Sequence, residues 1–334
     1  MSLFFNILAA SVSNIRVGGS NPSAPVESED LFDVSLKLQA NTSAIPVKSF
    51  YFFYPYKTTD FSKVVCDKEY FFLFSTDHDS NLGGLFIGKG NNLDLSDFQY
   101  VGQIQIFGSQ IETPRLVERN GVLFMYSHTD SNESGNNNMQ QTRVHTYSGL
   151  AAELQTITTW VDGGRPLGIV GDDNHTGYFN TYPNSSVGDI GIHITRGGLP
   201  QPCASSISSD GGYTYTRLEE DIDSITGVET NYFAQLQDGR YFTYKGQQFW
   251  IGHLHPQSNI VTTGIWKVEK KIIIAKTTNA YFSSITQKRQ IYPDLMLRSS
   301  PYIVGDIAYV YFTKLKTDLY VGKYDLRNLD QWLT

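Results

Sequence analysis

The chain has 334 residues, of which 26 are lysine or arginine and 33 are aspartate or glutamate, so its formal net charge is −7. This length suits one large fold or two ordinary domains. The 21 tyrosines and 20 phenylalanines, together with only 18% charged residues, exclude disorder over most of the chain. The acidic balance and the lack of a lysine–arginine cluster argue against binding to phosphates, so we expect no nucleic acid partner.

The N-terminal segment is apolar but short. Residues 1–10 are mostly apolar, and no positively charged residue precedes the apolar run. Such a run is too short to span a membrane and lacks the basic start of a secretory leader, so we expect neither. We expect residues 1–46 to pack on or close a domain formed by residues 47–334, or to contact neighbours in a homo-oligomer or a virion.

The predicted elements, taken along the chain, are strands. Short aromatic and β-branched runs recur at residues 50–54, 70–74, 123–126 and 309–312. Glycine, asparagine, aspartate or proline lies close to most of these runs, which is the pattern of strands bounded by turns. No stretch of useful length has helical periodicity. The sequence therefore predicts an all-β protein.

A repeated hairpin is the most informative feature of the sequence. An apolar anchor is followed by a turn with glycine, aspartate or asparagine, and an apolar strand begins five positions after the anchor. The anchors lie at residues 65, 117, 187, 244 and 304. Their spacing fits four-stranded blades, and five of these fill the chain, so we predict a five-bladed β-propeller of four-stranded antiparallel blades. A β-sandwich with similar hairpins is the alternative.

One turn motif agrees with a propeller. Residues 208–215 fit the Asp-box pattern Ser-x-Asp-x-Gly-x-Thr-aromatic, which occurs on outer hairpins of sialidase-like propellers. The Asp210 carboxylate can accept backbone N–H bonds within the turn, and the glycine can take a positive φ. We therefore predict a structural role for Asp210 rather than a catalytic one.

Four segments carry a family resemblance. The similar segments are residues 60–78, 83–88, 95–102 and 112–121. They resemble the first and second blades of five-bladed glycoside hydrolases, such as glycoside hydrolase family 43 and its furanosidase relatives. The resemblance implies that Asp60 is the general base. Arg115 stands at the second-blade position of the family's pKa-tuning aspartate. The nearest candidates for the family's third-blade acid are Glu219, Glu220 and Glu229.

The repeat also predicts which residues face the propeller axis. Counting five residues back from the anchors aligns Asp60 with Glu112, Gly239 and Ser299. In a propeller the start of each innermost strand faces the central pocket, so we expect Asp60 and Glu112 to point into one region. Glycoside hydrolysis needs two such carboxyl groups, and we predict these two as the catalytic pair. The alternative is that both are solvated turn residues.

Further polar residues are candidates for sugar binding. Residues 171–178 place Asp173 and His175 beside an aromatic residue, which suits sugar hydroxyls or a metal, although a polar loop is the simpler interpretation. His253 and His255 share one strand face. The predicted substrate-binding residues are Arg115, His128, Asp173, His175 and His253. No cofactor is predicted, while calcium or another axial metal stays open.

Two functions from different classes follow. The first is a carbohydrate-active enzyme, a glycoside hydrolase that acts on polysaccharide through paired carboxylates. The second is a non-catalytic structural or receptor-binding virion protein, such as a phage tail, knob or capsid decoration protein. The loops rich in asparagine, serine and glycine, and the expectation of no secretory leader, favour the second. A virion or extracellular location is favoured over a cytoplasmic one.

Overall fold

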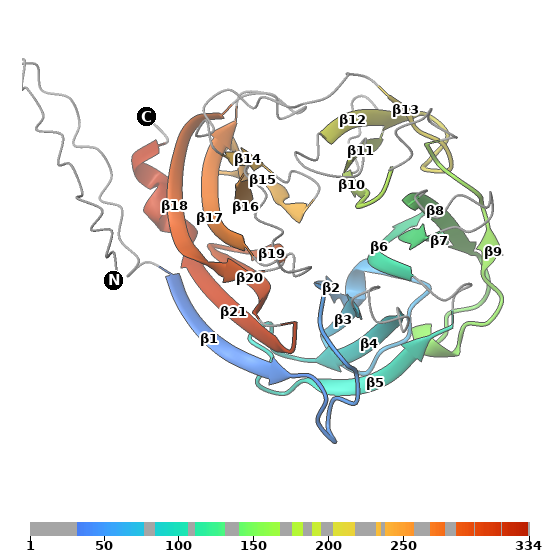
Figure 1. The fold of residues 1–334 in the computed structure, drawn as a ribbon. Helices are drawn as coiled ribbons and strands as arrows, with labels where there is room; N and C mark the ends of the chain where they lie inside the picture. Colours follow the sequence, from blue (N-terminus) through green and yellow to red (C-terminus); the bar gives the residue numbers. More distant parts are fainter. Residues whose placement is uncertain are drawn as a thin grey trace, which may run out of the picture.

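The protein is an all-β propeller of five blades around one axis (Figure 1). The computed structural model describes residues 32–76, 84–105, 111–130, 140–167, 176–182, 189–194, 203–217, 232–234, 238–256, 268–277, 285–296, 298–314 and 316–332. The predicted fold class is confirmed. Each described blade is an antiparallel sheet with its first strand nearest the centre.

Three blades have four strands in simple order. The first blade contains β2 (Phe52–Lys57), β3 (Tyr70–Ser75), β4 (Leu85–Gly90) and β5 (Gln99–Ile104). The second contains β6 (Ile111–Arg119), β7 (Val122–Asp130), β8 (Gln140–Tyr147) and β9 (Val161–Asp162). The third contains β10 (Asn180–Tyr182), β11 (Asp189–Ile194), β12 (Cys203–Ser208) and β13 (Thr216–Arg217). Three short 3-10 helices are η2 (Thr58–Asp60), η5 (Leu154–Thr156) and η7 (Leu326–Trp332).

The last two blades depart from this simple order. The fourth blade contains β14 (Tyr232–Ala234), β15 (Arg240–Tyr244), β16 (Gln247–Pro256), β17 (Val268–Thr277) and β18 (Ile285–Met296). Its inner edge is divided, because β14 and β15 both pair with β16. The fifth blade contains β19 (Ser299–Val304), β20 (Ile307–Lys314), β21 (Asp318–Asp325) and β1 (Phe32–Gln39).

The first described strand closes the propeller. β1 pairs antiparallel with β21, from Phe32 opposite Tyr324 to Gln39 opposite Asp318. Strands from the two ends of the described chain therefore complete the same blade (Figure 1). This pairing covers an edge of β21 that would otherwise expose unpaired backbone groups. The predicted contacts of residues 1–31 with neighbouring chains lie outside the described residues.

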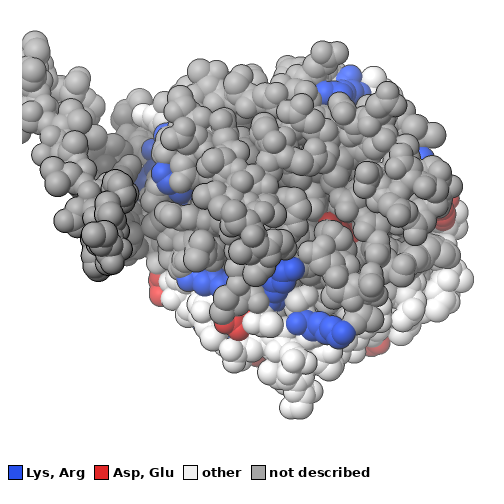
Figure 2. Space-filling model, viewed as in Figure 1, with Lys and Arg blue, Asp and Glu red and all other residues white. Residues whose placement is uncertain are grey.

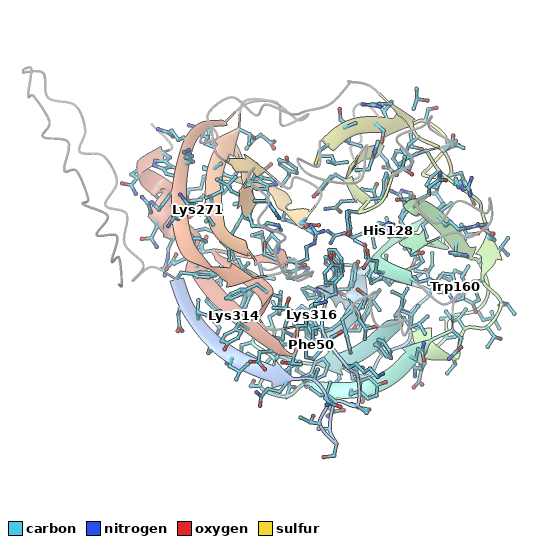
Figure 3. All side chains as sticks on the ribbon, in the orientation of Figure 1. Phe50, His128, Trp160, Lys271, Lys314 and Lys316 are labelled. Carbon is cyan, nitrogen blue, oxygen red and sulfur yellow. The ribbon has the colours of Figure 1, made fainter. Side chains whose placement is uncertain are left out.

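Aromatic side chains fill the spaces between blades, as Figure 3 shows for the side chains as a whole. Phe53 of the first blade illustrates this, since its ring centroid lies 5.5 Å from that of Phe72 and 5.4 Å from that of Tyr311 in the fifth blade. Rings at such separations add to the free energy gained by burying their surface. Each strand run recognised in the sequence therefore packs between neighbouring sheets rather than against solvent.

The predicted hairpin of the first blade is wrong. Val64 and Val65 do not belong to an inner strand, and Val64 forms only an isolated bridge with Ala152. The inner strand is β2, and residues 58–69 connect it to β3. The physical reason is that β2 is buried on both faces near the axis, so its sequence is a continuous apolar run without alternation.

Other anchors of the repeat lie where the hairpin pattern predicts. Val117 is on β6 opposite Phe124, Tyr244 ends β15, and Val304 ends β19. Each is followed by a tight turn into the next strand, with a positive φ at Gly121, Gly246 and Gly305. The anchor at residue 187 lies outside the described residues.

Charge on the described surface is mixed. Figure 2 shows separate blue and red areas among white ones over the described part of the face that it presents. Among the described residues, no helix combines the length and apolar character that crossing a membrane requires.

Asp210 organises the turn after β12. Its Oδ1 accepts hydrogen bonds from the backbone N–H groups of Tyr213 and Thr214 at 3.0 Å each, and the hydroxyls of Ser208 and Thr214 also donate to its carboxylate. Gly211 and the next glycine have positive φ values. Burial opposes ionisation, but these hydrogen bonds outweigh it and lower the pKa of Asp210 to about 2.

We expect Asp210→Ala to lower the free energy of unfolding at pH 7 by about 1–2 kcal/mol, because the turn loses several hydrogen bonds at an exposed site. The folded-state pKa lies below the ordinary value of 3.8, so this stabilisation is present above about pH 4 and is lost as the pH falls towards about 2. Urea unfolding from pH 2 to 7 measures it. Asp210→Asn, which keeps an acceptor, should lose less, and a pH-independent difference between wild type and alanine variant would contradict the prediction.

Candidate functional site

The starts of the inner strands bring a group of polar side chains together at one end of the axis. We call this group the axial charge cluster; its members are Tyr51, Glu112, His128, Tyr178, Asp238, His253, Arg298 and Ser299. All eight are buried. Each of the five blades supplies a member within two residues of the start of an inner strand, which explains how residues so distant in sequence meet.

Arg298 is at the centre of this cluster. Its Nη1 donates to Asp238 Oδ2 at 2.7 Å, and its guanidinium lies 4.4 Å from the Tyr178 ring centroid. Tyr51 is also in contact, with its hydroxyl 3.5 Å from Arg298 Nη2. Burial opposes the charge of Arg298, but Tyr51 and Asp238 outweigh it and hold the pKa of Arg298 well above its usual value. The axis therefore contains a permanently charged buried guanidinium.

Asp238 links Arg298 to the fourth blade. Its side chain is fully buried, and among the described residues its Oδ1 has no hydrogen-bond partner. His253 on β16 lies with Nε2 3.7 Å from Asp238 Oδ2, and its Nδ1 is 2.8 Å from Ser299 Oγ. Gly239 follows Asp238, and any side chain there would overlap the Trp250 indole. The Asp-Gly pair thus interrupts the inner edge of this blade and directs a carboxylate towards the axis.

Glu112 and His128 form the second-blade part of the cluster. They lie opposite each other on β6 and β7, with Glu112 Oε1 2.7 Å from His128 Nδ1. The His128 ring lies 4.8 Å from that of Tyr178, which connects the pair to Arg298. Burial and then the charge of Glu112 raise the pKa of Tyr178 well above its usual value. The phenol therefore stays neutral at physiological pH.

A bulge in β6 explains why Glu112 and Arg115 both reach the axis. Residues three apart on a regular strand point to opposite faces. Here the pairing register shifts between Glu112 and Arg115, and Thr113 has a φ of 56°. Such a bulge re-aims side chains. Arg115 consequently stacks on Tyr54, with its guanidinium carbon 3.6 Å from the ring centroid.

A cavity of about 300 Å³ lies at the opposite end of the axis, where the inner strands end. We call it the strand-end cavity; its principal lining residues are Tyr56, Asp60, Arg115, Tyr182, Arg240 and Tyr302. A recess of only about 30 Å³ continues from it towards Asp238. The cavity and the axial charge cluster are therefore distinct regions of one axis.

The structure separates Asp60 from Glu112. Asp60 ends η2 and lines the strand-end cavity, whereas Glu112 lies at the start of β6. The chain just after Asp60 contacts the end of β6, since the Ser62 N–H donates to Glu118 at 2.7 Å. Glu112 is six residues from Glu118, about 15–20 Å along a strand. The predicted pairing of Asp60 with Glu112 is wrong, because the repeat was aligned on Val64 and Val65, outside the inner strand.

The remaining predicted residues divide into two groups. His128 and His253 lie in the axial charge cluster, and Arg115 lines the strand-end cavity. Asp173 and His175 lie outside the described residues, as do Glu219, Glu220 and Glu229. Within the described ranges, no group of three or more histidine, cysteine, aspartate or glutamate side chains is arranged to hold a metal ion.

Sequence reasoning missed Asp238 and Arg298. The repeat pointed to Gly239 and Ser299, and each charged residue stands one position earlier. The sequence therefore did contain a signal for these two axial residues, because a charged residue immediately precedes each of two aligned positions. The sequence did not fix which of two adjacent positions faces the axis, because it does not show that the inner edge of the fourth blade is divided into β14 and β15.

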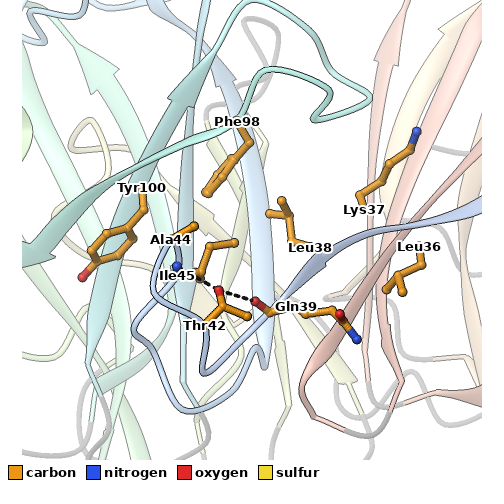
Figure 4. Close-up of a pocket in the computed structure, with 9 residues that line it drawn as sticks. All are labelled: Leu36, Lys37, Leu38, Gln39, Thr42, Ala44, Ile45, Phe98 and Tyr100. Atoms are coloured by element: carbon orange, nitrogen blue, oxygen red, sulfur yellow. Dashed lines mark hydrogen bonds between the residues drawn. The ribbon is translucent and has the colours of Figure 1, made fainter.

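A second cavity lies away from the axis (Figure 4). It encloses about 430 Å³ between β1 and the edge of the first blade, and Leu36, Leu38, Phe98 and Tyr100 contribute to its walls. Thr42 in the connecting loop accepts the Ile45 N–H at 3.1 Å and donates to the Gln39 carbonyl at 3.3 Å. Its described lining includes no carboxylate or histidine.

Comparison with known proteins supports the fold. No family profile matches this sequence, and no curated protein matches it. An exo-β-1,3-galactanase from Clostridium thermocellum superposes with a TM-score of 0.55 at 15% identity, over 86% of this chain and 62% of that one. A putative glycoside hydrolase from Bacteroides ovatus gives 0.56 at 9%, over 87% and 93%. A β-1,2-mannobiose phosphorylase from Listeria innocua gives 0.51 at 9%, over 75% and 69%. The chain thus has a propeller fold with glycoside hydrolases among its structural neighbours, as the sequence resemblance predicted.

Proposed function

We propose that the chain is a glycan-directed propeller that hydrolyses glycosidic bonds of a polysaccharide at the strand-start end of its axis. The observation that carries the proposal is the pair of buried carboxyl groups, Glu112 and Asp238, which two blades bring into one axial cluster. Hydrolysis uses one carboxyl group to protonate the leaving oxygen and a second to activate water or attack the sugar. The shared fold with a galactanase and a putative glycoside hydrolase is consistent with this chemistry.

Glu112 has the role of acid in this proposal. Its buried side chain lies at the start of the inner strand β6, and in this proposal it donates a proton to the leaving oxygen. Its partner His128 holds the carboxyl group in one orientation, with 2.7 Å between Oε1 and Nδ1. A fixed acid protonates the leaving oxygen without first losing side-chain freedom.

Asp238 has the role of the second carboxylate. Arg298 bonds one of its oxygens at 2.7 Å, while Oδ1 has no hydrogen-bond partner in the part of the chain that the structure describes. An oxygen without a competing bond is suited to accept a proton from water or to attack a sugar carbon.

A second candidate is glycan binding without turnover. The observation that favours it is that both carboxyl groups are buried and each has a basic partner, His128 or Arg298. The virion role expected from the sequence, and with it the proposed virion or extracellular location, stays a prediction that the structure does not test. Calcium or another axial metal likewise stays open.

A hydrolysis screen distinguishes the two candidates. Wild type, the double variant Glu112→Gln/Asp238→Asn and the exposed control Glu153→Gln are incubated with a panel of polysaccharides and aryl glycosides, and released reducing sugar is measured. The proposal expects release by wild type and control and none by the double variant, whose folding is checked by thermal unfolding. Binding without release in all three proteins would favour the second candidate, and equal release by the double variant would overturn the role of the pair.

A further inference from the structure

The strand-end cavity is not used by the proposed hydrolysis. Its volume of about 300 Å³ is at the lower end for small-molecule sites, so it suits one sugar ring rather than a long chain. The recess between it and Asp238 encloses about 30 Å³, which is too small for a sugar ring. A sugar ring in this cavity is therefore held apart from Asp238, which lines the recess.

The charges around the cavity leave an excess of positive charge. Glu118 is already engaged, because its carboxylate accepts the backbone N–H groups of Ser62 and Lys63 at 2.7 and 3.0 Å. Arg240 is exposed in the cavity wall and forms no ion pair with any carboxylate of the described residues. Its guanidinium carbon lies 5.7 Å from the centroid of the Tyr302 ring. The cavity thus presents a guanidinium that is available to an anionic group.

Two tyrosines in the cavity wall have hydroxyls that are held by backbone groups. The Tyr182 hydroxyl donates to the Gly239 carbonyl at 2.9 Å, and the Tyr56 hydroxyl accepts the Leu116 N–H at 2.9 Å. Burial raises the pKa of Tyr182 to about 12, so this phenol is neutral at physiological pH. Because the hydroxyls are held by the backbone, the rings keep their positions without a ligand. Preorganised aromatic faces of this kind are suited to packing on a sugar.

Asp60 adds a hydrogen-bond acceptor to the lining of the same cavity. Burial raises the pKa of Tyr302, the charge of Arg240 opposes this effect, and the charge of Asp60 adds to it. An acidic group would repel a bare multivalent anion, but it accepts hydrogen bonds from sugar hydroxyls. An arginine, an aspartate and aromatic walls together match a molecule with a carboxylate, several hydroxyls and a ring.

We propose that the strand-end cavity binds a uronic acid residue, with Arg240 paired to the sugar carboxylate and Asp60 accepting a hydroxyl hydrogen bond. The walls of Tyr56, Tyr182 and Tyr302 enclose the ring. This site is separate from the proposed hydrolytic centre. A chain that binds an acidic sugar at one end of its axis and acts on a glycan at the other would recognise acidic polysaccharides.

Calorimetric titration of the full chain tests the site. The probes are galacturonate and glucuronate, the neutral sugars galactose and glucose, and inorganic sulfate, all at low ionic strength. We expect a uronate to bind at least tenfold more tightly than its neutral counterpart and than sulfate. Arg240→Gln should weaken uronate binding by about 10–100-fold, the value of a charge-assisted hydrogen bond pair. The control Arg327→Gln removes the same charge beside Asp325 on the outer surface and should leave binding unchanged.

Several results would overturn the site. These are no uronate binding, equal binding of sulfate, equal binding of neutral sugars, or an unchanged affinity in Arg240→Gln. Glu112→Gln separates this inference from the proposed hydrolysis, because it should abolish turnover and keep uronate affinity. Loss of uronate affinity in Glu112→Gln with full affinity in Arg240→Gln would move the ligand to the axial charge cluster and contradict the proposal.

Discussion

Replacing Asp238 by alanine is expected to lower the free energy of unfolding by about 3–5 kcal/mol. The reason is the guanidinium of Arg298, which is buried, charged and bonded to Asp238 at 2.7 Å. Removal of the carboxylate leaves the Arg298 charge without its anionic partner. Water cannot replace that partner while the guanidinium stays buried. Urea unfolding with an unchanged m-value gives the difference directly.

The double variant Asp238→Ala/Arg298→Met is the informative control. Methionine removes the charge and keeps much of the side-chain volume, so the double variant should be more stable than Asp238→Ala alone. If the loss of unfolding free energy in the double variant equals the sum of the losses in Asp238→Ala and Arg298→Met, the ion pair has no special role. If Asp238→Ala does not fold, Asp238→Asn keeps the shape and a hydrogen-bond acceptor, and it should fold with a smaller loss. A loss below about 1 kcal/mol in Asp238→Ala would contradict the prediction.

Glu112→Gln is expected to lower kcat/KM for glycan hydrolysis by about 10²–10⁴-fold, which is the usual contribution of a general acid. Glutamine keeps the shape of the side chain but cannot donate the required proton. The loss should be much smaller for an aryl glycoside whose leaving group needs no protonation. The pH–rate profile should also lose its fall on the alkaline side, because that fall reports deprotonation of the acid.

The comparison of the two substrates separates a catalytic role from a structural one. A glutamine that merely disturbed packing against His128 would reduce both rates by a similar factor, and that outcome would contradict the acid role. Glu153→Gln, at an exposed position on the second blade, provides the matched control for the same chemical change. It should retain the wild-type rate and pH profile.

The sequence by itself determined the class and repeat of this fold. Runs such as 70–74 and 309–312 are β3 and part of β20, because aromatic and β-branched residues bounded by turns have few alternatives to a strand. The turns at Gly121 and Gly305 were also readable, since positive φ values favour glycine. Glu112, His128 and His253 were recognised as polar residues of the inner region, and all three are in the axial charge cluster.

Only the tertiary structure decided which residues meet on the axis. Asp60 was aligned with Glu112 by counting from a hairpin, yet the long connection between β2 and β3 places Asp60 at the other end. Asp238 and Arg298 are 60 residues apart and meet at 2.7 Å. Local sequence patterns depend on the hydrogen bonds and burial of single strands. The relative position of inner strands in different blades, which share no hydrogen bonds, is set only when the five sheets close into a ring. The partners of a buried charge follow from that register, so they appear only when the ring is formed.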